Sequence, residues 1–252
     1  MIHFVNITEK EFLSSKRLYK HLPLENALKA LNEKQLWFAN PKEWQDPFEK
    51  RFIDAQYMRK GQRVSLKWTE RIFCSCMSMT SSSEAYWRVY AQDQLCVEFR
   101  INRATLLEEL KRHSDCDIYI GRVEYMLTNS ITQPLKQIPF NPPCPYPTHS
   151  PLFFARLLLL KRFSFKYEDE IRIIVVTNEA LKKNGIALSY GCESTTLVNQ
   201  IVLDPRIGNN TALMLKHVFE DKYGFKKTPN GSPCVVKSGL YSAQNKTVLE
   251  ID

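Results

Sequence analysis

The chain has 252 residues, of which 44% are hydrophobic and 25% charged, so it has the composition of a globular protein with room for a sizeable core. Its formal net charge of +8 admits an anionic partner such as a nucleic acid, although a lysine-rich surface has the same charge balance. The basic residues are scattered in pairs and never reach five in a row, which excludes a basic tail.

The seven cysteines and the absence of a long apolar segment bear on location. Residues 1–6 lack a basic start followed by an apolar run, so no signal peptide is expected. Cys74 and Cys76 stand two apart and the five histidines are isolated, a spacing that argues against a structural zinc site. The apolar stretch 152–160 is broken by Arg156 and is too short to span a bilayer. We therefore expect a cytoplasmic protein with reduced thiols, no membrane association and no bound metal.

Local patterns in the first half of the chain predict alternating strands and helices. Branched or alternating apolar residues indicate strands at residues 17–21, 35–39, 71–79, 95–101 and 118–125. Helices are expected over residues 24–31, around Trp87 and Tyr90, and after Asn102, whose side chain suits a helix N-cap.

Residues 128–151 are the least regular part of the chain, and the proline-rich stretch 141–147 should be an extended loop. A plain insertion is the simplest interpretation; a lid or a partner-binding loop are the alternatives. Beyond it we expect a helix at residues 151–161, strands at 168–176, 198–203 and 234–241, and a helix at 211–223. With no Gly/Ser linker, this pattern predicts one α+β domain over residues 1–252, with a mixed, mainly antiparallel sheet flanked by helices.

Three consecutive acids precede a run of branched apolar residues that should be a buried strand. The acids begin this strand and side chains alternate along it, so we expect Glu168 and Glu170 to share one face and Asp169 to take the other. Such a carboxylate pair suits binding of a ribose hydroxyl or stabilisation of positive charge at an anomeric carbon. Arg172 lies on the same face, so a structural ion pair with Glu170 is the alternative, and composition alone favours it.

Two other strands carry polar groups that suit a ligand. Lys20 is a compact charge suited to phosphate and His21 a donor near neutral pH, next to Tyr19 on the strand 17–21. Ser78 and Thr80 place hydroxyls at a strand end, where they can brace a carboxylate across the sheet. The simpler interpretation of Lys20 and His21 is that they lie on a strand face exposed to solvent.

The remaining candidates are aromatic or acidic. Trp87 and Tyr90 suit stacking on a flat ring such as nicotinamide, although core packing is the more frequent use of such aromatics. No glycine-rich phosphate loop is present. Asp46, Glu49 and Glu168 are the residues that a metal-dependent hydrolase would use, but their spacing does not demand it.

The order of several blocks resembles a bacterial domain-of-unknown-function family (DUF number twenty-nine seventy-one). The blocks are Leu18-Tyr19-Lys20, residues 36–41, Asp46-Pro47-Phe48-Glu49, the Trp-x-x-Tyr-Ala block at 87–91 and the Tyr-Glu-x-Glu-x-Arg block at 167–172. Gln45 stands where the family usually has Asn. Together the blocks span nearly the whole chain.

More distantly, the chain looks like the ADP-ribosyltransferase superfamily, with a basic residue on a first strand, Ser-x-Thr on a second and Glu-x-Glu on a third. This resemblance implies NAD as substrate, Glu170 and Glu168 as catalytic residues, and a role as a toxin or anti-phage effector that modifies nucleic acid or protein. The residues that it implies for holding NAD are Tyr19, Lys20, His21, Ser78, Thr80, Trp87 and Tyr90. The alternative is a non-catalytic nucleic-acid-binding or protein-interaction module, suggested by the net charge and the proline-rich loop.

Overall fold

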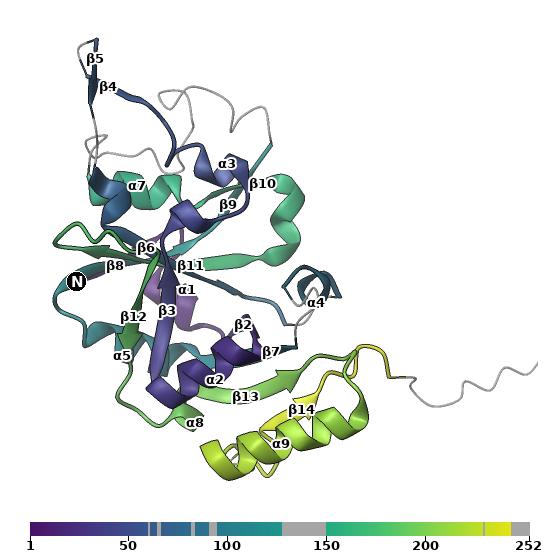
Figure 1. The fold of residues 1–252 in the computed structure, drawn as a ribbon. Helices are drawn as coiled ribbons and strands as arrows, with labels where there is room; N and C mark the ends of the chain where they lie inside the picture. Colours follow the sequence, from purple (N-terminus) through teal and green to yellow (C-terminus); the bar gives the residue numbers. More distant parts are fainter. Residues whose placement is uncertain are drawn as a thin grey trace, which may run out of the picture.

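A ten-stranded sheet runs through the computed structural model (Figure 1), which describes residues 1–59, 61–64, 67–81, 84–90, 95–127, 150–228 and 230–242. Nearly all of the expected insertion at 128–151, including the proline-rich stretch 141–147, lies outside these residues. The sheet has the order β1-β8-β11-β6-β2-β7-β13-β14, and β3 pairs with both β6 and β12.

The sheet is mixed but mainly antiparallel, as predicted, because only the pairs β1–β8 and β13–β14 are parallel within it. Its strands are β1 (Ile2–Val5), β2 (Arg17–Pro23), β3 (Gln35–Ala39), β6 (Ile72–Ser78), β7 (Cys96–Asn102), β8 (Cys116–Arg122), β11 (Glu170–Thr177), β12 (Gly185–Ser189), β13 (Val198–Leu203) and β14 (Val235–Lys237). Two small ribbons lie apart from it: β4 (Tyr57–Arg59) with β5 (Gln62–Val64), and β9 (Glu124–Met126) with β10 (Leu160–Arg162). The α+β class expected from the sequence is thus confirmed.

Helices cover the sheet (Figure 1). They are α1 (Glu9–Leu13), α2 (Leu24–Glu33), α3 (Pro47–Lys50), α4 (Glu84–Tyr90), α5 (Arg103–Lys111), α7 (Pro151–Leu157), α8 (Ser194–Leu197) and α9 (Asn209–Tyr223). Asn102 caps α5 as predicted, since its Oδ1 accepts the backbone N–H groups of Ala104 and Thr105 at 3.0 and 3.2 Å. Among the described residues no helix is both long and apolar enough to cross a bilayer.

Strand β11 is buried on both faces, which is why its residues 173–176 are all apolar instead of alternating with polar residues. Ile171, Ile173 and Val175 belong to a core that also contains side chains of α1, α2, α5 and α9. Ile174 and Val176 belong to a second core, which packs against α7. Glu170 and Arg172 lie on this second face, because side chains alternate along the strand.

Three of the predicted boundaries were wrong. The strand expected at 118–125 is divided into β8 and β9, and Val123 between them donates its N–H to the carbonyl of Glu170 at 2.9 Å. The helix expected at 151–161 ends at Leu157, and Leu160–Arg162 form β10 alongside β9. A continuous apolar run does not distinguish a buried helix from a buried strand, so periodicity alone did not reveal this change. The last strand is only Val235–Lys237.

Candidate functional site

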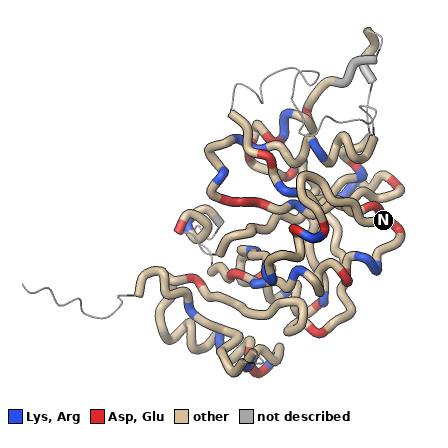
Figure 2. Tube along the Cα trace, turned by 180° about the vertical axis from the view of Figure 1, so that it is seen from behind, with Lys and Arg blue, Asp and Glu red and all other residues tan. Residues whose placement is uncertain are grey.

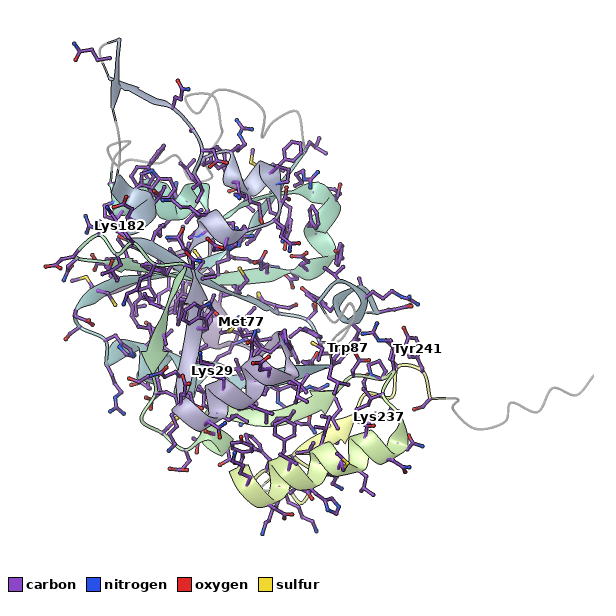
Figure 3. All side chains as sticks on the ribbon, in the orientation of Figure 1. Lys29, Met77, Trp87, Lys182, Lys237 and Tyr241 are labelled. Atoms are coloured by element: carbon purple, nitrogen blue, oxygen red, sulfur yellow. The ribbon has the colours of Figure 1, made fainter. Side chains whose placement is uncertain are left out.

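The sheet divides at β6, and the candidate site lies in the division. β6 pairs with β11 along its whole length, but it pairs with β2 only through Ser78 and Tyr19 and with β3 only through Cys74 and Ala39. The space where β2 and β6 diverge is a cavity of about 140 Å³. Its lining comprises Tyr19, Lys20, His21, Cys76, Met77, Ser78, Tyr86, Glu168 and Glu170; Met77 is labelled in Figure 3.

The strand register brings three of the predicted site residues to one level. Glu170 of β11 is the cross-strand partner of Ser78 on β6, and Ser78 is the partner of Tyr19 on β2. Directly opposed residues have side chains that are close neighbours. A carboxylate, a hydroxyl and an aromatic ring therefore meet at the mouth of the division.

Glu170 belongs to a buried network of five charged side chains. Its Oε1 accepts from Arg172 Nε at 2.9 Å, and its Oε2 accepts from Arg172 Nη2 at 3.0 Å and from Lys161 Nζ at 3.2 Å. Lys161 also donates to Glu168, and Arg172 also donates to Glu49. Each of the five side chains is at most 9% exposed. Buried charges are tolerated when they are paired in this way.

The network sets the protonation of its members. Burial alone would raise the pKa of Glu170, but the positive charges of Arg172 and Lys161 outweigh it and lower that pKa to about 2. Burial does raise the pKa of Glu168, despite the opposing charge of Lys161. The two neighbouring carboxyl groups thus have pKa values displaced in opposite directions, with Glu170 ionised at neutral pH.

The turn that carries the acids differs from the strand expected there. Glu168 ends a 3-10 helix at Phe163–Glu168, and Asp169 adopts a left-handed backbone with φ of 39°. Only Glu170 belongs to β11, so the prediction that three acids begin the strand was wrong. Asp169 points away and pairs with Arg122 at 2.8 Å. Glu168 and Glu170 nevertheless reach the same ammonium group, that of Lys161.

Hydroxyl groups hold the backbone of this turn. The carbonyl of Glu168 accepts from Ser78 Oγ at 2.8 Å and from the phenol of Tyr86. The N–H of Glu170 donates to the hydroxyl of Tyr125 at 2.9 Å. Ser78 therefore stabilises the acidic turn by donating to the backbone carbonyl of Glu168, whereas the sequence predicted a contact between the Ser78 hydroxyl and a carboxylate.

Lys20 and His21 approach the cavity from β2. Lys20 Nζ donates to Ser75 Oγ at 2.9 Å and to the carbonyl of Cys76 at 3.1 Å, and burial lowers the pKa of Lys20. The ring of His21 stacks on Tyr86 with centroids 4.8 Å apart and an interplanar angle of 4°. Burial lowers the pKa of His21 to about 4 although Glu98 is 3.5 Å away, so the imidazole is neutral at pH 7.

Two predicted residues, Trp87 and Thr80, do not line the cavity. Trp87, labelled in Figure 3, is fully buried, makes an edge contact with His21 and packs with Cys96 and Val202. Thr80 is exposed and donates its N–H to Ser78 Oγ at 3.0 Å. The side chain of Tyr90 lies outside the described residues.

Sequence reasoning missed Lys161 as a site residue, and it considered Glu49 only for a metal-dependent reaction. Lys161 directly follows the apolar stretch 152–160, and a lysine in that context requires a buried acidic partner. Glu49 lies in α3, a segment without a clear pattern, and nothing local connects it to Arg172.

The acids considered for a metal-dependent hydrolase each contact a cation. Asp46 pairs with Arg162 at 3.1 Å, whereas Glu49 and Glu168 belong to the buried network. In the described part of the chain no group of three or more His, Cys, Asp or Glu side chains has the arrangement of a metal site.

Comparisons with known proteins do not identify a family for this chain. No protein-family model, no curated protein and no solved structure matches it. The resemblances to the domain-of-unknown-function family and to the ADP-ribosyltransferases therefore stay predictions, and the geometry of the cavity carries the functional argument.

Proposed function

We propose that the protein is an ADP-ribosyltransferase-like enzyme that breaks the glycosidic bond between nicotinamide and ribose in NAD. The observation that supports this best is the meeting of Tyr19, Ser78 and Glu170, from three neighbouring strands, around one cavity. A concave site with a few convergent polar groups and perturbed pKa values is the usual setting for substrate binding.

The two carboxylates suit the two demands of this reaction. When the bond to the ribose C1′ breaks, its electron pair leaves with nicotinamide and positive charge develops on the ribose. Glu170, with a pKa of about 2, is ionised at neutral pH and so opposes that charge. Glu168, with its raised pKa, is the better proton acceptor and takes the proton that the incoming acceptor group loses as it bonds to C1′.

The size of the cavity agrees with one ring-sized part of the substrate. A protein cavity of roughly 150 Å³ accepts a benzene molecule, and this cavity measures about 140 Å³. We therefore assign it to the nicotinamide ring and its ribose bond, with the remainder of NAD extending outside. Tyr19 supplies an aromatic wall, the role first expected of Trp87 or Tyr90.

Lys20 supplies a hydrogen-bond donor for the substrate. An ammonium group has three N–H donors, and in the described part of the chain two of those of Lys20 are accepted by Ser75 and by the carbonyl of Cys76. The third is left for an oxygen of the bound molecule, such as a ribose hydroxyl or the nicotinamide carbonyl. This role does not require phosphate recognition by Lys20.

The test is release of nicotinamide from NAD by the purified protein and its Glu170→Gln variant. We expect the rate of nicotinamide release by the variant to be about 100-fold lower than that of the wild type, because one electrostatic contact to a charged transition state is lost. Equal nicotinamide release by the two proteins would remove Glu170 from the reaction.

A matched control separates chemistry from folding. Glu49→Gln removes the same charge from the same network, because Glu49 also contacts Arg172, but Glu49 does not line the cavity. Both variants should lose thermal stability, whereas Glu49→Gln should reduce the activity per folded molecule far less than Glu170→Gln. A parallel loss in both would indicate that the network is structural only.

A further inference from the structure

A second, larger hollow lies at the other end of β2. It measures about 860 Å³ and crosses the start of β2, the end of β7 and the start of β13, facing the segment that follows α9. We call it the β2–β13 groove. Its lining includes Lys16 and Arg17, the amides of Asn199 and Gln200, and Lys227 with Thr228 and Asn230.

The charge of this groove is one-sided. Its described lining residues include three cations, Lys16, Arg17 and Lys227, and no carboxylate. Across the described chain none of the three forms an ion pair, whereas most other parts of the molecule mix basic and acidic residues (Figure 2). A concave site with unpaired cations and neutral amides attracts a polyanion.

A row of side-chain contacts connects the groove to the cavity along one face of the sheet. Gln200, which lines the groove, accepts at Oε1 from Arg100 Nη1 at 2.8 Å. The guanidinium of Arg100 lies 5.8 Å from the ring centroid of Tyr19, and Tyr19 lines the cavity. Arg17 and Tyr19 are two residues apart on β2, so their side chains share this face.

We propose that the β2–β13 groove binds a single nucleic-acid strand through its phosphodiester backbone. The described lining contains no aromatic side chain on which a base would stack, so contacts to phosphates, and not to bases, account for binding. Binding should therefore be independent of sequence and sensitive to salt. This inference goes beyond the proposed NAD reaction and does not depend on it.

The test uses fluorescence anisotropy of a fluorescein-labelled, mixed-sequence single-stranded DNA of about 16 nucleotides, without NAD. Three phosphate contacts on a single strand give a slope of about −2 in log K against log salt, so raising NaCl from about 50 to about 200 mM should weaken binding about 20-fold. In Lys16→Gln/Lys227→Gln only one such contact is left, and the same change of salt should weaken binding about threefold.

The matched control is Lys29→Gln/Lys182→Gln, which removes the same charge from two exposed lysines that do not line the groove (Figure 3). We expect this control to keep the wild-type salt slope. Equal slopes in the groove variant and the control, or no strand binding by the wild type, would overturn the inference. So would a raised KM for NAD in the groove variant with strand binding unchanged, because the groove would then hold the phosphates of NAD. A protein that binds the strand through the groove but releases no nicotinamide would refute the proposed NAD reaction alone.

Discussion

Replacing Arg172 by Met tests whether the buried carboxylates of the network depend on its positive charge. The side chain of Arg172 is 1% exposed, donates to Glu170, Glu49 and the carbonyl of Leu158, and lies 4.5 Å from the ring centroid of Trp44. Met preserves much of the apolar contact but removes the guanidinium. Glu170 and Glu49 would then lose their strongest donor while staying buried.

The expected cost is large and follows from two separate estimates. Removing one partner of a buried ion pair costs about 3–5 kcal/mol of folding free energy. Lowering the pKa of Glu170 from 4.5 to about 2 corresponds to about 3 kcal/mol of stabilisation of its ionised form. We therefore expect Arg172→Met to lower the free energy of unfolding by about 3–5 kcal/mol at pH 7.

The loss should depend on pH in a defined direction. A carboxyl group with a depressed pKa stabilises the folded state fully above pH 4.5, and this contribution disappears as the pH falls toward 2. In Arg172→Met the burial of Glu170 persists without its main counter-charge, so that contribution is absent. The difference in stability between wild type and variant should therefore shrink as the pH is lowered from 7 toward 3.

Urea unfolding followed by circular dichroism at several pH values measures this difference. Arg122→Met is the matched control, because Arg122 is half-exposed and its ion pair with Asp169 lies at the surface, where such a pair contributes no more than about 1 kcal/mol. A loss in Arg172→Met as small as that of the control, or one that is constant between pH 7 and 3, would refute the idea that Arg172 stabilises the buried carboxylates.

Two further predictions concern stability outside the acidic network. The pKa of His21 is lowered to about 4, so the neutral ring stabilises the folded state fully above pH 6.5, and the free energy of unfolding should fall by about 2 kcal/mol between pH 7 and 5. In urea unfolding, His21→Gln should remove this pH dependence. A titration of the His21 imidazole near pH 6.5 by NMR would contradict the prediction. Asn102→Ala should lower the free energy of unfolding by about 1 kcal/mol because it removes the N-cap of α5, whereas Asn102→Ser should retain most of the wild-type stability. Equal thermal midpoints for the two variants would contradict the capping role.

The strands of the site could be predicted, but its charges could not. β2, β6 and β11 each have a local pattern of apolar residues, and three of their polar residues, Lys20, Ser78 and Glu170, do converge on one cavity. The partners of Glu170 are Lys161 of β10 and Arg172 of its own strand, and both of them also pair with Glu49 of α3, at positions set by tertiary packing. No local rule links Lys161 or Glu49 to that point.

Glu170 both forms an ion pair with Arg172 and lines the cavity. Arg172 was considered as a rival explanation that would leave Glu170 on an open strand edge, whereas the structure has both the ion pair and the cavity lining. The two roles are compatible, because it is the positive charge of Arg172 and Lys161 that keeps the buried Glu170 ionised. An i, i+2 pair on a strand face predicts the contact but does not indicate what else the carboxylate faces.

The division of the sheet at β6 has a consequence for when the cavity forms. The three directly opposed residues at the cavity are Tyr19, Ser78 and Glu170, so the cavity requires contacts between segments about 60 and about 90 residues apart. Such contacts form only after long loops close, and a growing chain lacks β11 until residues 170–177 have been made. A nascent or truncated polypeptide that ends before β11 therefore cannot display the cavity, and any activity that depends on the cavity arises only after β11 has been made.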